Sequence, residues 1–120
     1  MQKILVVDDV QTDRELVGAV VSQSGNQPVY AVDGDQALEK AKSEKPALVF
    51  LDVVMPKHDG FKACRTLKSD PETAKIPVVL VTSKGTESDK FWGKKQGADG
   101  HLVKPFTPDA LLSVIKTFVR

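Results

Sequence analysis

Five short apolar runs, each ending in a polar or charged residue, constrain the fold of this chain more than any other feature. With their polar ends, they occupy residues 3–9, 30–33, 48–52, 78–82 and 101–105. Helix-like segments separate the runs, and this alternation predicts repeated βα units around a parallel sheet. Because all strands of such a sheet point the same way, their polar ends should gather at one edge, where these folds bind ligands.

The first two intervening segments carry clear helix signals. Thr12–Glu15 has the spacing of a capping box, so a first helix is expected from Thr12 to Gly25. Its apolar side should consist of Leu16, Val17, Val20 and Val21. A second helix should follow Asp33 and stop before Pro46.

Three further helices are expected in the second half of the chain. One should start after Asp59 and end near Asp70, because the proline that follows disfavours a helix at the residue before it. Another should span residues 86–96, and the last should have Thr107 as its N-cap and Pro108 as its first residue. With right-handed crossovers, these elements predict a three-layer α/β/α sandwich with a doubly wound parallel sheet.

Composition limits the classes of function. The 120 residues suffice for one domain, and 17 Lys and Arg against 16 Asp and Glu leave a net charge of +1, so nucleic acid and membrane surfaces are not favoured partners. The single cysteine, Cys64, cannot form an internal disulfide and fits a reducing compartment. The first apolar run is too short for a signal peptide, so a soluble cytoplasmic protein is expected.

A set of short motifs follows the runs in a fixed order. They are Asp8-Asp9 after the first run, Asp52 with Met55-Pro56 and Asp59-Gly60 after the third, Thr82 after the fourth, and Lys104-Pro105-Phe106 after the fifth. In this order and at these separations, they make the chain similar to response-regulator receiver domains from end to end. The resemblance implies a flavodoxin-like strand order 2-1-3-4-5 and a single receiver domain over residues 1–120 without an output domain. Residues 89–98 also look like single-domain regulators of type IV pilus twitching-motility and chemotaxis-like systems.

Asp52 is the expected phosphoacceptor. A carboxylate can accept a phosphoryl group from a histidine kinase as an acyl phosphate. Read alone, an aspartate at the end of a strand is more often a turn or helix cap, but the neighbouring acidic pair favours the functional interpretation. Asp8 and Asp9 could likewise be solvated loop acids. Three converging carboxylates become favourable, however, when a hard cation lies between them.

Mg²⁺ is the cation that we expect at this site. The resemblance implies that Asp9 and Asp52 contact the metal, that Asp8 acts through water, and that the backbone carbonyl of Val54 completes the protein ligands. No cluster of His and Cys offers the softer ligands that Zn²⁺ prefers.

Two further residues at strand ends complete the expected site. Lys104 would balance the charge of the phosphoryl group, although a lysine at a strand end is ordinarily just solvated. The resemblance implies a cis Lys104-Pro105 bond, with Pro105 fixing the backbone of the lysine. The Thr82 hydroxyl would donate to a phosphoryl oxygen and act as a switch, or Thr82 could simply pack within its strand. Val54 and Lys84 are expected to flank the entrance to the acyl phosphate and to tune its hydrolysis.

His101 departs from the family pattern, which commonly has Tyr or Phe there. It could be a rotameric and titratable switch residue or an ordinary surface histidine. The resemblance places the output surface, which would contact a downstream protein, on the predicted helix over 86–96, the strand near 101–104 and the helix after Thr107. Trp92 could contact such a partner or pack internally.

The predicted function is that of a phosphorylation-controlled response regulator rather than an ordinary enzyme, with its own autophosphorylation and autodephosphorylation activity. A phosphate sink in the same pathway is an alternative. An aspartyl-phosphate phosphohydrolase would need Asp-x-Asp-x-Thr after the first strand, and here the segment is Asp8-Asp9-Val10-Gln11-Thr12. A flavin carrier of this fold would need a phosphate loop rich in Ser, Thr and Gly after the first strand, and this sequence has none there. An unphosphorylated interaction module of the same fold is the last alternative.

Overall fold

The computed structural model describes residues 2–53, 59–82, 94 and 97–119. The strands are β1 (Lys3–Val7), β2 (Gln27–Ala31), β3 (Leu48–Asp52), β4 (Val78–Thr82) and β5 (Gly100–Val103). The helices are α1 (Gln11–Gln23), α2 (Gly34–Glu44), α3 (Asp59–Ser69) and α5 (Pro108–Phe118). The helix expected over residues 86–96 falls almost entirely outside the described residues.

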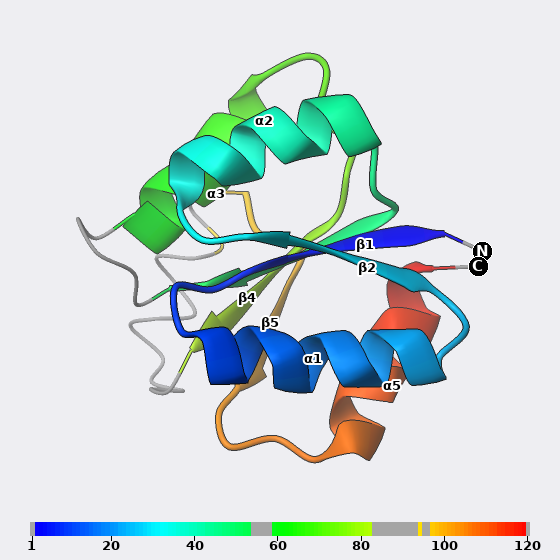
Figure 1. The fold of residues 1–120 in the computed structure, drawn as a ribbon. Helices are drawn as coiled ribbons and strands as arrows, with labels where there is room; N and C mark the ends of the chain where they lie inside the picture. Colours follow the sequence, from blue (N-terminus) through cyan, green and yellow to red (C-terminus); the bar gives the residue numbers. More distant parts are fainter. Residues whose placement is uncertain (1, 54–58, 83–93, 95–96, 120) are drawn as a thin grey trace.

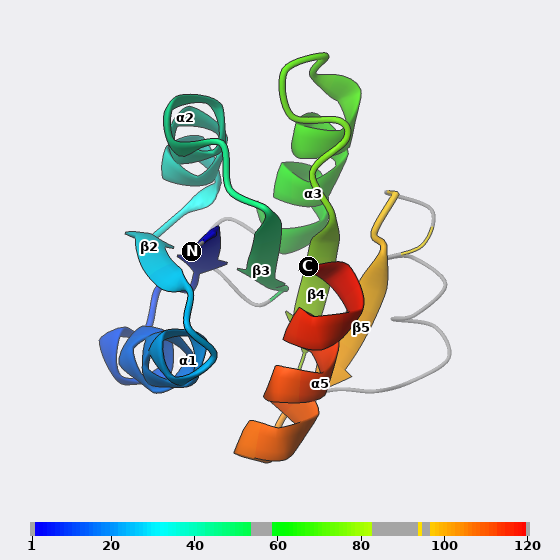
Figure 2. The same cartoon turned by 90° about the vertical axis from the view of Figure 1, so that its right-hand side faces the viewer.

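The five strands form one parallel sheet in the order β2-β1-β3-β4-β5, which confirms the expected fold. Helices α2 and α3 cover one face of the sheet, and α1 and α5 cover the other (Figure 1). The view in Figure 2 shows the same three layers from the side, with the sheet between the two pairs of helices. Within the described residues, no helix is long and apolar enough to cross a membrane.

Successive side chains along the central strands point to opposite faces of the sheet, which divides the core into two halves. Leu5, Leu51 and Leu80 point into one hydrophobic cluster, which includes Ala37 of α2 and Leu67 of α3. The intervening strand residues, such as Phe50, point into a second cluster against α1 and α5. All five residues of β3 and all five of β4 are buried, as expected for central strands of a sheet covered on both faces.

Two expectations about α1 are wrong. The helix begins at Gln11 rather than Thr12, and its N-cap, Val10, makes no side-chain capping bond. The helical ladder already starts there, because Arg14 N–H donates to the Val10 carbonyl at 3.0 Å, so Thr12 lies inside the helix. Leu16 is 61% exposed rather than inward, whereas Val17, Val20 and Val21 are buried.

The helices expected after Asp33 and after Thr107 begin where the sequence predicted. The Asp33 side chain accepts a hydrogen bond from Gln36 N–H at 2.8 Å and caps α2. Thr107 accepts from Ala110 N–H at 3.1 Å and caps α5, which has Pro108 as its first residue. The Lys104-Pro105 peptide bond is cis, as the resemblance implied.

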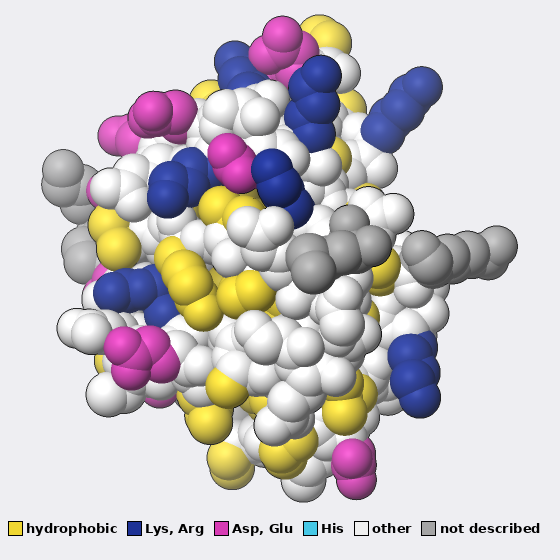
Figure 3. All heavy atoms as spheres, turned by 45° about the vertical axis from the view of Figure 1, so that its right-hand side comes forward, with side chains coloured by type: hydrophobic (Ala, Val, Ile, Leu, Met, Phe, Trp, Pro, Cys, Tyr) yellow, Lys and Arg dark blue, Asp and Glu magenta, His cyan; other side chains and the backbone are white. Residues whose placement is uncertain are grey.

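The surface carries charges of both signs. On the face in Figure 3, Lys and Arg side chains stand beside Asp and Glu side chains in the upper half, and hydrophobic side chains gather below them. Lys42 of α2, for example, pairs with Asp70 at 2.9 Å. Among the described residues on this face, charges of the two signs are mixed.

Candidate functional site

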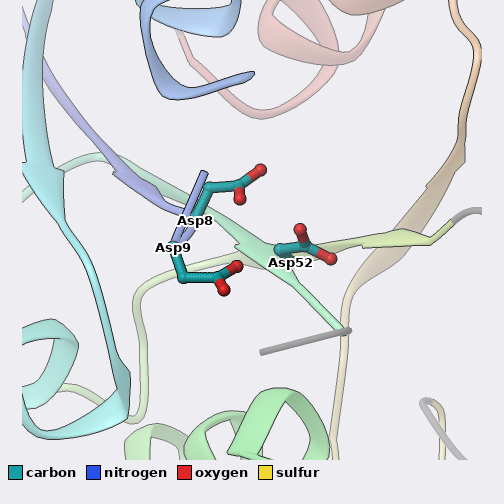
Figure 4. Close-up of side chains that lie close together, drawn as sticks. All are labelled: Asp8, Asp9 and Asp52. Atoms are coloured by element: carbon teal, nitrogen blue, oxygen red, sulfur yellow. The ribbon is translucent and has the colours of Figure 1, made fainter. Parts of the chain in front are cut away.

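Three carboxylates meet at the edge of the sheet where the strands end. Asp8 and Asp9 directly follow β1, and Asp52 is the last residue of the neighbouring strand β3. Each of the three offers a carboxylate oxygen, and these oxygens lie within 4.8 Å of one another (Figure 4). Asp8 and Asp52 are buried, with 4% and 6% exposure, whereas Asp9 is exposed. The geometry thus brings together the three acids singled out in the sequence.

The electrostatics of Asp8 reflect this crowding. Burial raises the pKa of Asp8, and the nearby charge of Asp52 and a hydrogen bond to it raise it further. The hydrogen bond from Val10 N–H, at 2.9 Å to Asp8 Oδ1, and the charge of Lys104 act in the opposite direction without cancelling the effect. A cation bound beside Asp8 and Asp52 would offset the cost of burial and the repulsion between the two carboxylates.

Lys104 lies against this cluster, just beyond β5. Its Nζ is 3.3 Å from Asp52 Oδ2 and 3.4 Å from Asp8 Oδ2. It is also 3.1 Å from Asp13 Oδ2, the shortest of the three contacts. Burial would lower the pKa of Lys104, but the hydrogen bond to Asp13 and the charges of Asp52 and Asp8 outweigh burial and raise it. Lys104 is therefore held as an ammonium ion among carboxylates.

The first turn of α1 supplies two site residues that the sequence reasoning missed. Asp13 provides the third carboxylate at Lys104, and Arg14 Nη1 donates to the Asp8 backbone carbonyl at 2.7 Å. Both residues lie within Thr12–Glu15, which was interpreted as a capping box. That interpretation gave the segment a role at the start of the helix, so no contact with the site was predicted. The acidic residue one turn beyond an acidic strand end was the only signal in the sequence.

Thr82 lies beside the cluster at the end of β4. It is 2% exposed, and its carbonyl accepts a hydrogen bond from Lys104 N–H at 2.7 Å. The residue before it, Val81, is the partner of Asp52 in the β3–β4 ladder. The backbone thus places the threonine, the lysine and the central aspartate on three adjacent strand ends.

Gly60 lets α3 begin directly against the main chain of Asp52 and Val53. A Cβ at Gly60 would lie 2.4 Å from Val53 Cα, 2.5 Å from Val53 O and 2.7 Å from Asp52 O. No side chain fits at these distances, so glycine is required for a close approach rather than for an unusual backbone angle. This contact gives the Asp59-Gly60 motif a structural reason.

The remaining predicted residues are placed less centrally or are not described. His101 is half-buried in β5, where it pairs with Leu80 of β4, and Pro105 is exposed. Val54 and Lys84 lie outside the described residues, as does Trp92. The roles assigned to all these residues stay predictions.

Comparison with known protein families assigns the chain to one of them. The response regulator receiver domain family matches residues 4–116. The chain belongs to this family.

Relatives and solved structures agree with this assignment. The receiver domain is 44% identical to Protein PilH of Pseudomonas aeruginosa, over 96% of this chain and 95% of that protein. It spans about half the length of the curated transcriptional regulators that it also matches. The structure of the chemotaxis response regulator CheY4 of Vibrio cholerae superposes with a TM-score of 0.92, at 32% identity and over 99% of both chains.

A further solved structure bears on the fold and contains a metal. The receiver domain of the sensor histidine kinase PA1611 from Pseudomonas aeruginosa has a TM-score of 0.89 at 23% identity, over 98% of this chain and 96% of that one. A magnesium ion is coordinated in its active site cleft. In this chain, the donor set of Asp8, Asp9 and Asp52 consists of carboxylate oxygens alone, which fits Mg²⁺, and receiver domains bind Mg²⁺ at this acidic pocket.

Proposed function

We propose that this receiver domain accepts a phosphoryl group on Asp52 from a histidine kinase, with Mg²⁺ held by Asp8, Asp9 and Asp52 and by the Val54 carbonyl. One observation carries the proposal: buried Asp52 lies between two further carboxylates and the Lys104 ammonium. A buried charge normally needs one partner, and a simple ion pair would not bring three carboxylates together. The arrangement suits a site that binds a cation and a phosphoryl group at once.

The chemistry follows from the positions of the side chains. An Asp52 carboxylate oxygen attacks the phosphorus of phosphohistidine; a new O–P bond forms, and the P–N bond breaks with its electron pair returning to the imidazole. Bound Mg²⁺ would neutralise charge on the phosphoryl oxygens. The Lys104 ammonium, whose Nζ is 3.3 Å from Asp52 Oδ2, supplies a second positive charge next to the phosphoryl group. Hydrolysis reverses the modification when water attacks the phosphorus, releasing inorganic phosphate and restoring the carboxylate.

Phosphorylation then has a route to a partner surface. The phosphoryl group adds negative charge and strong acceptors next to β4. The Thr82 hydroxyl would donate to one of these acceptors, and the tie between Thr82 O and Lys104 N–H links β4 to β5. His101 of β5 completes the proposed switch, and Val54 and Lys84 would tune hydrolysis. A downstream protein would bind the surface formed by residues 86–96, β5 and α5.

The relatives favour a chemotaxis-like pathway. CheY4, which matches over 99% of both chains, is a chemotaxis response regulator, and residues 89–98 resemble regulators of twitching-motility and chemotaxis-like systems. We infer that the protein works in the cytoplasm, either as an output regulator or as a phosphate sink. The lifetime of the phosphorylated form separates these roles, because a sink must lose its phosphoryl group quickly.

Intact-mass measurement after incubation with Mg²⁺ and acetyl phosphate tests the proposal. The native chain should gain one phosphoryl group, with acetate as the leaving group. The modification should be lost in Asp52→Asn and in the presence of a chelator. Asp33→Asn is the matched control, because Asp33 also follows a strand end but caps α2, a role that asparagine performs equally well. Equal labelling of the Asp52→Asn chain would refute the assignment.

A further inference from the structure

Asp13 makes the shortest contact of Lys104, although it belongs neither to a strand end nor to the carboxylates that would hold a metal. Asp13 Oδ2 lies 3.1 Å from Lys104 Nζ, against 3.3 Å for Asp52 and 3.4 Å for Asp8. Asp13 comes from the first turn of α1, 91 residues away from Lys104 in the chain. Asp13 is thus a fourth carboxylate at this site, in addition to Asp8, Asp9 and Asp52.

The three donors of the lysine ammonium are already directed at three carboxylates. A lysine side chain offers three N–H donors and no more, and Asp8, Asp13 and Asp52 each lie within reach of one. When Asp52 carries a phosphoryl group, at least one of these donors must turn toward a phosphoryl oxygen. Phosphorylation is thus an exchange of partners at Lys104 rather than the addition of a partner to a free ammonium.

Asp13 is the partner that can leave at least cost. The side chains of Asp8 and Asp52 are only 6% and 8% exposed, so an unpaired charge there would stay buried, whereas that of Asp13 is 41% exposed. Asp13 also lines a groove of about 530 Å³ between α1 and the connection from β5 to α5, with Leu16 and Phe106 among its walls. When Lys104 turns to the phosphoryl group, water can take over the Asp13 carboxylate.

We propose that Asp13 is a positioning residue that competes with the phosphoryl group for Lys104 and thereby favours the unphosphorylated state. This inference rests on the proposed phosphorylation of Asp52. In the resting protein, Asp13 holds the ammonium and stabilises it. In the phosphorylated protein, the same carboxylate is an anion close to an added anion, and it is repelled. Asp13 therefore sets how much phosphodonor the domain needs.

Asp13→Asn isolates the charge from the shape. Asparagine is nearly isosteric and keeps an oxygen that can accept from Lys104, but it removes the competing negative charge. The concentration of acetyl phosphate that half-saturates Asp52 labelling should fall about two- to fivefold, the range expected for a partly exposed ion pair. The phosphorylated form should also decay more slowly after the donor is removed.

A matched control separates this effect from a change in helix stability. Asp109 is an exposed acid in the first turn of α5, as Asp13 is an acid in the first turn of α1. Asp109→Asn changes the net charge and the helix-dipole interaction in the same way, and it should leave the half-saturating concentration unchanged. Asp13→Glu should restore a value close to that of the native chain, because it restores the charge.

Salt gives a readout that a purely structural role would not change. At about 1 M salt the screening length is only about 3 Å, so the difference between Asp13→Asn and the native chain should shrink while both are still labelled. A labelled native chain with an unchanged Asp13→Asn variant would overturn this inference and leave the proposed function intact. Weaker labelling of Asp13→Asn than of Asp109→Asn would overturn it too, because Asp13 would then assist phosphorylation. An unlabelled native chain would overturn the proposed function, and this inference with it.

Discussion

Two lysines of similar exposure have very different surroundings. The Lys68 side chain in α3 is 17% exposed, and the Lys104 side chain is 24% exposed. Lys68 Nζ pairs with Asp99 Oδ2 at 2.7 Å and donates to the backbone carbonyls of Ala74 at 3.2 Å and Ile76 at 2.8 Å. Lys104 instead faces three carboxylates.

The contrast separates a structural site from a functional one. One ammonium, one carboxylate and two neutral carbonyls balance each other at Lys68, and the Asp99 carboxylate is also bonded to Val78 N–H at 2.8 Å. Those groups connect α3, the chain before β4 and the chain before β5, and they need no ligand. At Lys104 the carboxylates outnumber the cation, so the described side chains alone leave excess negative charge. Of these two half-buried lysines, only Lys104 has partners that leave the local charge unbalanced, as a ligand-binding site would.

The largest expected effect comes from removing the ammonium group of Lys68, the lysine with a structural role. Lys68→Met leaves the Ala74 and Ile76 carbonyls and the Asp99 carboxylate without their cation, and the free energy of unfolding should fall by about 2–3 kcal/mol. Urea unfolding measures it, with Lys75→Met as control, because Lys75 is exposed in the same connection. Equal losses in the two variants would show that the Lys68 contacts contribute little.

A smaller effect should distinguish Lys104 by its response to metal. Lys104→Met should lower the free energy of unfolding by about 1–2 kcal/mol in a chelator, since the carboxylates then repel one another. Mg²⁺ should recover most of this loss, because a ligand that binds only the folded state stabilises it. The loss in Lys68→Met should be the same with and without Mg²⁺. Unfolding midpoints in Mg²⁺ and in chelator provide the test, and a Lys104→Met loss that Mg²⁺ leaves untouched would contradict it.

A weaker, pH-dependent effect should come from Asp8. Its pKa in the folded state is raised, mainly by burial and then by Asp52, so the folded protein binds a proton more readily than the unfolded chain. Without metal, the Asp8 contribution should therefore become more favourable to folding as the pH falls through that raised pKa. Mg²⁺ affinity should decline over the same range, at a higher pH than for an ordinary aspartate. Asp8→Asn should remove both trends, as measured by unfolding and by metal titration in acidic buffers.

The smallest expected effect concerns Cys64, which lies one turn before Lys68. Burial raises the pKa of the Cys64 thiol to about 11, and the charge of Lys68 only partly opposes this. The native thiol should react slowly with a disulfide reagent at about pH 8, and Lys68→Met should raise its pKa further. Stability should fall only as the pH rises from the ordinary thiol pKa, about 8.5, toward the folded value. Fast labelling of the native chain in the absence of denaturant would contradict the burial argument.

The sequence predicted those features that have a local signature. Apolar runs with polar ends located the strands, and parallel geometry then brought Asp8, Asp52 and Lys104 to one edge, as the structure shows. Thr107 was recognised as a cap because a cap bonds to the backbone three residues ahead, and the second helix was expected to follow Asp33, which the structure shows to be its cap. The order of the strands came from the family resemblance rather than from any residue pattern.

One error is local to the start of a helix, and the other errors and omissions share a physical cause. The interpretation of Thr12 as a cap failed because the helical ladder begins two residues earlier, at Val10. Leu16 matched a helical period but lies beside a groove rather than the core. Asp13 gains its role from a residue far along the chain, and Lys68 bonds mainly to backbone carbonyls, which every residue type carries. Contacts of these kinds depend on the tertiary structure and leave no pattern in the sequence.

The close approach at Gly60 has a mechanical consequence. The start of α3 rests on the main chain of Asp52 and Val53 with no side chain in between, and main chain is far stiffer than a rotatable group. A displacement of the main chain at Asp52 and Val53 therefore cannot be absorbed by rotamer changes at this point. Such a displacement would be transmitted directly to the start of α3, so under the proposed phosphorylation of Asp52 this helix would respond although none of its side chains need touch the phosphoryl group.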